Sequence, residues 1–90
     1  MEKEIKKLNK LLLNKNISKL KMYNTVTKIL KIKSLACDDM MECKGDNKII
    51  FYKQIGETYT NPIKIIIEYE IVNRYFYEDI IKVTKIYKED

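Results

Sequence analysis

Histidine is absent from the 90-residue chain. Without histidine the chain cannot build the Ser-His or Cys-His pairs that activate nucleophiles, and it lacks the side chain most used for general acid–base catalysis near neutral pH. A zinc ion would be left with thiolates and carboxylates as ligands. No other catalytic arrangement replaces these, so the sequence predicts a protein that is not an enzyme and has no catalytic residues.

Cysteine is scarce, and the two cysteines, Cys37 and Cys43, are poorly spaced for a bridge or a metal. If both lie in one extended segment, their Cα atoms stand about 20 Å apart at ~3.3 Å per residue. A disulfide needs them within about 7 Å. No C-x-x-C pair is present, and two thiols alone make a poor zinc site. We therefore predict no disulfide, metal or cofactor, and we interpret both thiols as small buried hydrophobes.

Arginine is represented by Arg74 alone, beside seventeen lysines. Because arginine is preferred for bidentate contacts to guanine and phosphate, its scarcity argues against sequence-specific reading of DNA. The net charge of +5 is unevenly spread. Residues 1–33 carry ten lysines and two glutamates, and an acidic segment at residues 34–47 follows. The lysine-rich third is compatible with a nucleic-acid or acidic-protein partner, and equally with a solvated surface.

Long hydrophobic runs are also missing. No apolar stretch approaches the roughly 18 residues that a membrane-spanning helix needs. The N-terminus is charged and has no apolar core of the kind found in secretory signals. At 46% hydrophobic residues the chain is rich enough to fold. We therefore expect one small domain over residues 1–90, in the cytoplasm and without a membrane segment.

The clearest structural signal is the stretch at residues 62–72, PIKIIIEYEIV. Its apolar residues recur with a period of two, which is typical of a half-buried strand. Glu68 and Glu70 lie on the opposite face, so we expect that face to meet water or a partner. Pro62 opens the strand where its missing N–H does little harm. The residues predicted to face inward are Ile63, Ile65, Ile67, Tyr69 and Ile71.

The segments on either side predict a cover and further strands. Residues 2–14 are amphipathic, which predicts a helix lying over the inward face of 62–72. Residues 35–55 predict a hairpin, with strands near 35–43 and 48–55 around a turn rich in Gly, Asp and Asn. A last strand is predicted near 75–87. On one of its faces we place Ile81, Val83 and Tyr87, and on the other Ile80 and Ile86.

Residues 18–33 are harder to interpret. A strand is favoured because the apolar residues share one face at a period of two and because the segment contains several β-branched residues. So long a strand would be unusual, so we expect a bend near Asn24 or Lys28, or a short helical start from Ser18. The lysines on the second face of this segment are Lys19, Lys21, Lys31 and Lys33.

These elements combine into an α+β fold, in which an N-terminal amphipathic helix packs on an antiparallel β-meander of four to five strands. Two surfaces then stand out as partner-binding candidates. Tyr75-Phe76-Tyr77 follow a turn, and alternation must expose part of this cluster, as at many interface anchors. Glu68 and Glu70, on the outer face, and the four lysines of residues 18–33 complete the predicted binding residues.

The sequence therefore predicts a small, non-enzymatic interaction protein, and a homodimer is compatible with its sheet edges. Lys, Asn, Ile, Tyr and Phe make up more than half the chain, and all have A/T-rich codons. This composition suggests a virus-, phage- or mobile-element-encoded inhibitor that binds a host defence or nucleic-acid-processing protein. Such an anti-CRISPR-like role has no motif behind it. The alternative is a basic nucleic-acid-binding protein or a small toxin-type ribonuclease, using the lysines of residues 1–33.

Overall fold

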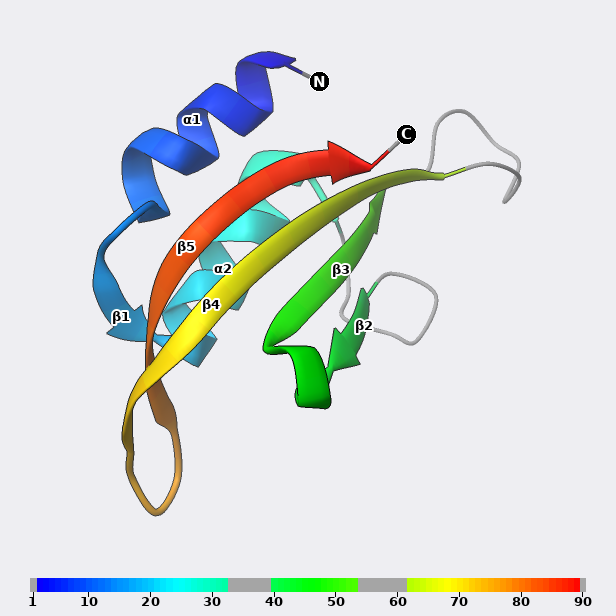
Figure 1. Ribbon diagram of the computed structural model, residues 1–90. Coiled ribbons are helices and arrows are strands. Elements are labelled where there is room, and N and C mark those ends of the chain that lie inside the picture. Colours follow the sequence, from blue (N-terminus) through cyan, green and yellow to red (C-terminus); the bar gives the residue numbers. More distant parts are fainter. Residues whose placement is uncertain (1, 33–39, 54–61, 90) are drawn as a thin grey trace.

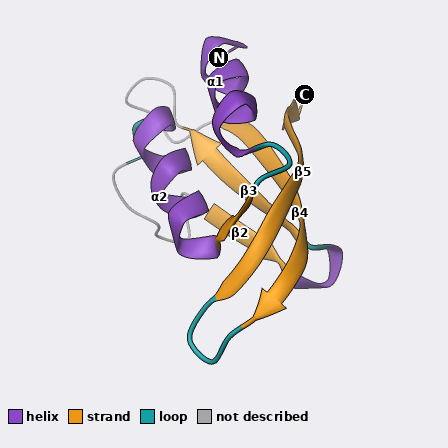
Figure 2. Cartoon of the chain, turned by 90° about the vertical axis from the view of Figure 1, so that its left-hand side faces the viewer, coloured by secondary structure: helices purple, strands orange, loops and turns teal. Residues whose placement is uncertain are grey.

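Two helices cover one face of a five-stranded sheet, and none of the described helices lies on the other face (Figures 1 and 2). The computed structural model describes residues 2–32, 40–53 and 62–89, with the side chain of Lys44 left out. The elements in chain order are α1 (Glu2–Leu12), β1 (Asn16–Ser18), α2 (Lys19–Leu30), β2 (Met40–Cys43), a 3₁₀ turn (Lys44–Asp46), β3 (Lys48–Lys53), β4 (Ile63–Arg74) and β5 (Asp79–Glu89).

The sheet has the order β1-β5-β4-β3-β2, and every neighbouring pair is antiparallel. The predicted α+β class and the packing of an N-terminal helix on a β-meander are thus confirmed. β2 and β3 form the predicted hairpin, although residues 33–39 and 54–61 lie outside the described residues. In the described part of the chain, no helix is both long and apolar enough to cross a bilayer.

The predicted inward face of β4 is correct at its centre. Ile65, Ile67 and Tyr69 are buried in the core, and Ile63 and Ile71 pack at its margin. β4 also buries Ile66 on the outer face, where Ile50 and Tyr87 are its partners on the adjoining strands. That face is therefore less open to water at this row than its two glutamates suggest.

The predicted faces of the last strand are wrong beyond Val83, because β5 is bulged. Glu68 pairs with Lys85 and Tyr69 pairs with Val83, so Thr84 has no partner opposite it. An extra residue shifts the alternation by one position. Ile86 consequently joins Ile81 and Val83 in the core, and Tyr87 turns to the outer face. A second bulge, at Val72, adds twist toward the end of the hairpin.

The prediction of a strand near 18–33 is also wrong: Asn16–Ser18 form a short strand, and Lys19–Leu30 is helical. The buried residues Met22, Val26 and Leu30 are spaced by four, a spacing that fits a period of two as well as one helical turn. The β-branched threonines are accommodated because Thr25 and Thr27 donate hydroxyl hydrogen bonds to the carbonyls four residues back, both at 2.9 Å.

Local capping explains why a helix forms here. The Ser18 hydroxyl accepts a hydrogen bond from the Lys21 N–H at 3.1 Å, which satisfies one free donor of the first turn. At the other end Lys31 adopts a left-handed conformation, with φ of 58°, and its N–H donates to the Thr27 carbonyl. Ser18 is thus the last residue of β1 and the cap of α2, which joins the helix to the sheet edge.

The core lies between the helices and the sheet. α1 contributes Leu8 and Leu12 and lies against β5 and α2. α2 reaches the other half of the sheet, where Tyr23 meets Phe51 of β3 edge to face with ring centroids 6.3 Å apart. The cover that we assigned to the N-terminal helix alone is thus shared by two helices.

Replacing the capping hydroxyl tests the helical assignment of α2. Ser18→Ala should lower the free energy of unfolding by about 1 kcal/mol, because the Lys21 N–H loses its acceptor while the strand pairing of residue 18 is kept. Ser18→Asp supplies another capping acceptor and should stay near the wild type. Urea denaturation followed by circular dichroism measures both, and equal stability of Ser18→Ala and wild type would contradict the capping role.

Candidate functional site

The β4–β5 hairpin ends in three exposed aromatic residues. The strands pair as far as Arg74 and Asp79, and the Tyr75 N–H donates to the Glu78 carbonyl at 3.0 Å to close the turn. Beyond the pairing, the exposed fractions are 55% for Tyr75, 103% for Phe76 and 85% for Tyr77. Figure 1 shows this turn projecting from the body of the protein. The predicted exposure of part of the cluster is confirmed. Its predicted place at the start of the last strand is wrong, because the three residues form the turn itself and β5 begins at Asp79.

A groove of about 440 Å³ separates this turn from the first turns of α2. Its α2 side carries Leu20, which is 57% exposed, and its rim carries charges of both signs. We call the three aromatic residues and this groove the aromatic tip site. The lining residues are Lys19, Leu20, Tyr23, Tyr75, Phe76, Tyr77, Glu78 and Asp79.

Lys19 is fixed at the base of the aromatic tip site by contacts with the sheet. Its ammonium forms an ion pair with Glu42 of β2 and lies 5.4 Å from the centre of the Tyr69 ring. The Tyr69 hydroxyl donates to the same carboxylate at 3.4 Å. The first turn of α2, which forms one wall of the groove, is thereby held against β2 and β4.

The ionisation of this cluster follows from its packing. Burial lowers the pKa of Lys19, but the hydrogen bond to Glu42 and the neighbouring tyrosines outweigh burial, and the net pKa is raised. Burial raises the pKa values of Tyr23 and Tyr69, and the nearby Lys19 opposes the rise. At neutral pH the lysine is therefore charged and both phenols are neutral.

The other predicted binding residues lie elsewhere. Glu68 and Glu70 are on the helix-free face, where Glu68 stands between Lys48 and Lys85 and Glu70 stands opposite Lys82. Opposite charges across strands stabilise a sheet, so the placement of these glutamates is explained by the sheet itself, without a binding partner. Lys21 is exposed on α2, away from the groove lining, and Lys31 lies at the far end of that helix. Lys33 lies outside the described residues.

The structure thus unites Tyr75, Phe76 and Tyr77 with Lys19, and it adds residues that the sequence reasoning missed. Leu20 and Tyr23 were missed because residues 18–33 were interpreted as a strand. Glu42 was missed because it meets Lys19 only through packing between elements distant in sequence. The sequence did contain a signal for the helix. Ser18 precedes apolar residues that recur every four positions, and a serine before such a pattern commonly begins a helix.

No group of three or more metal-ligating side chains occurs within residues 2–32, 40–53 and 62–89. Cys43 is half-buried in β2 with a free thiol, and Cys37 lies outside the described residues. Comparison with known proteins found no matching family model, no similar curated protein and no similar solved structure.

Alkaline titration tests the packing at the base of the aromatic tip site. The raised pKa values of Tyr23, Tyr69 and Lys19 give stability that is fully present below their ordinary values, 10.0 for tyrosine and 10.5 for lysine, and that is lost as pH rises through the raised values. Tyr69→Phe removes one titrating phenol and keeps its ring, so the fall in urea midpoint above pH ~10 should become shallower. Tyr77→Phe, in the exposed turn, is the matched control and should follow the wild type.

Proposed function

We propose that this protein is a non-enzymatic interaction protein that docks on a partner protein through the aromatic tip site. The observation behind the proposal is the complete exposure of Phe76 between two largely exposed tyrosines. Large apolar side chains are usually withdrawn from water, because full burial of a phenylalanine stabilises a fold by roughly 1.5–3 kcal/mol. Because Phe76 is not buried in the fold, the free energy of burying its ring can instead stabilise a complex with a partner.

The geometry of the tip favours a protein as that partner. Aromatic residues have few rotatable bonds, so ordering them at an interface costs little conformational entropy. The tip stands at the end of a paired hairpin, and the groove beside it offers the partner an apolar contact at Leu20. Lys19, Glu78 and Asp79 at the rim supply charges that select orientation more than affinity.

The narrower hypothesis is a virus-, phage- or mobile-element-encoded inhibitor that acts in the cytoplasm on a host defence or nucleic-acid-processing protein. A projecting aromatic turn suits inhibition, because it can occupy a pocket that the partner uses for its own ligand. The codon-linked composition is the support for this origin. Competition between this protein and the partner's ligand, measured on the isolated partner, separates an inhibitor from a passive binder.

Nucleic-acid binding stays the second candidate, because the lysines of α1 and α2 are largely exposed. Gel shifts with RNA and DNA at low and moderate salt test it, since phosphate binding weakens steeply with salt. Ribonuclease activity has less support, because the chain has no histidine and its single arginine stands at the hairpin.

Removal of the Phe76 ring should weaken docking strongly without unfolding the protein. Phe76→Ser should leave the free energy of unfolding within about 0.5 kcal/mol of the wild type, because the ring contacts solvent. Binding to a partner recovered from the native host should weaken at least about 30-fold, the effect of a hot-spot residue worth ~2 kcal/mol. Pull-down with mass spectrometry identifies the partner, and calorimetry measures the affinity.

Met41→Ser is the matched control, since Met41 is also an exposed apolar side chain but lies on β2 outside the site. It should bind the recovered partner like the wild type. Recovery of no partner, or recovery of one that binds Phe76→Ser as tightly as wild type, would count against the aromatic tip site as the docking surface.

A further inference from the structure

A second hollow lies between the two helices, on the side of the protein that the aromatic tip site does not use. It is a cleft of about 540 Å³. That volume is within the roughly 300–1,000 Å³ range of small-molecule sites. One wall is a row of side chains on α1. The other wall is a row of side chains on α2 together with Lys31, the residue at the C-terminal end of that helix. We call it the interhelical cleft, and its lining residues are Lys3, Glu4, Lys7, Leu11, Thr25, Lys28, Ile29 and Lys31.

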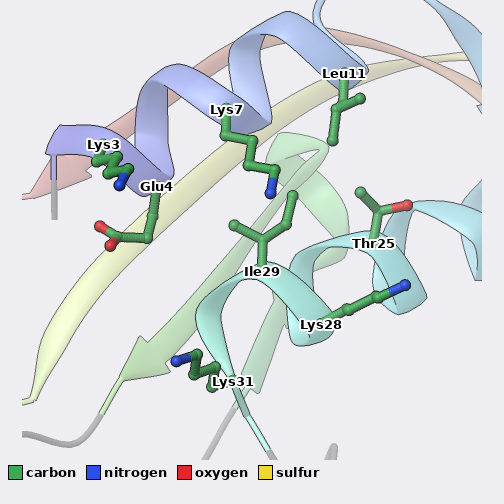
Figure 3. A pocket seen from close by; sticks show the side chains of 8 residues that line it. All are labelled: Lys3, Glu4, Lys7, Leu11, Thr25, Lys28, Ile29 and Lys31. Carbon is green, nitrogen blue, oxygen red and sulfur yellow. The ribbon is translucent and has the colours of Figure 1, made fainter.

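Helical spacing brings these side chains together. Lys3, Lys7 and Leu11 follow one another at intervals of four along α1, which places them on one face. Thr25 and Ile29 have the same spacing on α2. Figure 3 shows the Lys7 and Leu11 side chains extending from α1 into the space above Ile29.

The cleft combines an apolar floor with a cationic rim. Leu11 is 40% exposed although it is aliphatic, and Ile29 is half-buried, so both leave hydrocarbon accessible. Four of the eight lining residues are lysines, against one glutamate. A backbone hydrogen bond lowers the pKa of Glu4, so this carboxylate is charged at neutral pH and the rim still carries a net positive charge.

This combination selects a ligand by its chemistry. The lysines favour a carboxylate or phosphate group, and the aliphatic floor favours a hydrocarbon chain attached to it. Nucleic acid fits less well, because the described residues that line the cleft include no aromatic ring and no arginine for stacking on bases. We infer that the interhelical cleft binds a soluble amphiphilic anion with a single aliphatic chain, whose head group contacts Lys3 and Lys7 and whose chain lies on Leu11 and Ile29.

The test uses dodecanoate, at concentrations where it is monomeric, as the probe for the full-length protein. Calorimetry should show saturable binding, and amide NMR shifts should change along α1 and α2 and not at residues 75–77. Lys7→Gln and Leu11→Ser should each weaken binding by about tenfold, because one removes a charge-assisted contact and the other removes apolar contact. Neither side chain is in the buried core, so both variants should fold.

Two matched controls distinguish binding in the cleft from nonspecific electrostatic or hydrophobic association. Lys6→Gln removes an exposed lysine of the same helix outside the cleft, and Val72→Ser removes an exposed aliphatic side chain on β4. Both should bind dodecanoate like the wild type. Dodecyltrimethylammonium, which has the same chain and the opposite charge, should not bind in the cleft.

The remaining outcomes would overturn the inference. Equal binding of the cationic and anionic amphiphiles, or equal weakening by Lys6→Gln and Lys7→Gln, would show nonspecific association. Absence of dodecanoate binding would also overturn the inference. Binding of a single-stranded oligonucleotide, or of a vesicle of anionic phospholipid, could then still lose affinity in Lys7→Gln. Such binding of the oligonucleotide would assign the cleft to nucleic acid, and such binding of the vesicle would assign it to a membrane surface.

Discussion

The long antiparallel pairing of β4 with β5 is the interaction on which the other elements depend. Its backbone pairing runs from Lys64 and Glu89 to Arg74 and Asp79, and its inner face supplies most of the core isoleucines. β3 and β1 pair with its two edges, and the helices lie over one of its faces. Short helices like α1 are marginal alone, so this apolar face is what stabilises them.

Both proposed binding surfaces follow from this arrangement. Pairing continues beyond the helical cover, so the turn at residues 75–78 carries its aromatic side chains into solvent. At the other side, the two helices lie next to each other over the sheet, and their neighbouring stripes line the interhelical cleft. The two surfaces share no residue, so an aromatic-mediated contact and an anion-binding contact can occur independently.

Prediction from sequence succeeded where one period was unambiguous. The inner face of β4 was recognisable because isoleucine or tyrosine recurs at every second position from 63 to 71, and partial exposure of Tyr75-Phe76-Tyr77 followed from alternation along the predicted last strand. It failed where a local pattern had two meanings. Met22, Val26 and Leu30 fit a strand and a helix alike, and the unpaired Thr84 shifted the face of Ile86 without any mark in composition.

The sequence by itself determined the α+β class, the amphipathic N-terminal helix, the central strand and the absence of histidine chemistry. Each depends on composition or on contacts between residues near in the chain. Only the tertiary structure decided the bulges of the hairpin and the assembly of the two surfaces. These depend on partners distant in sequence: Lys19 meets Glu42 across 23 positions, and Lys7 faces Ile29 from another helix. Such neighbours are set by packing, which one chain's local periodicity does not encode.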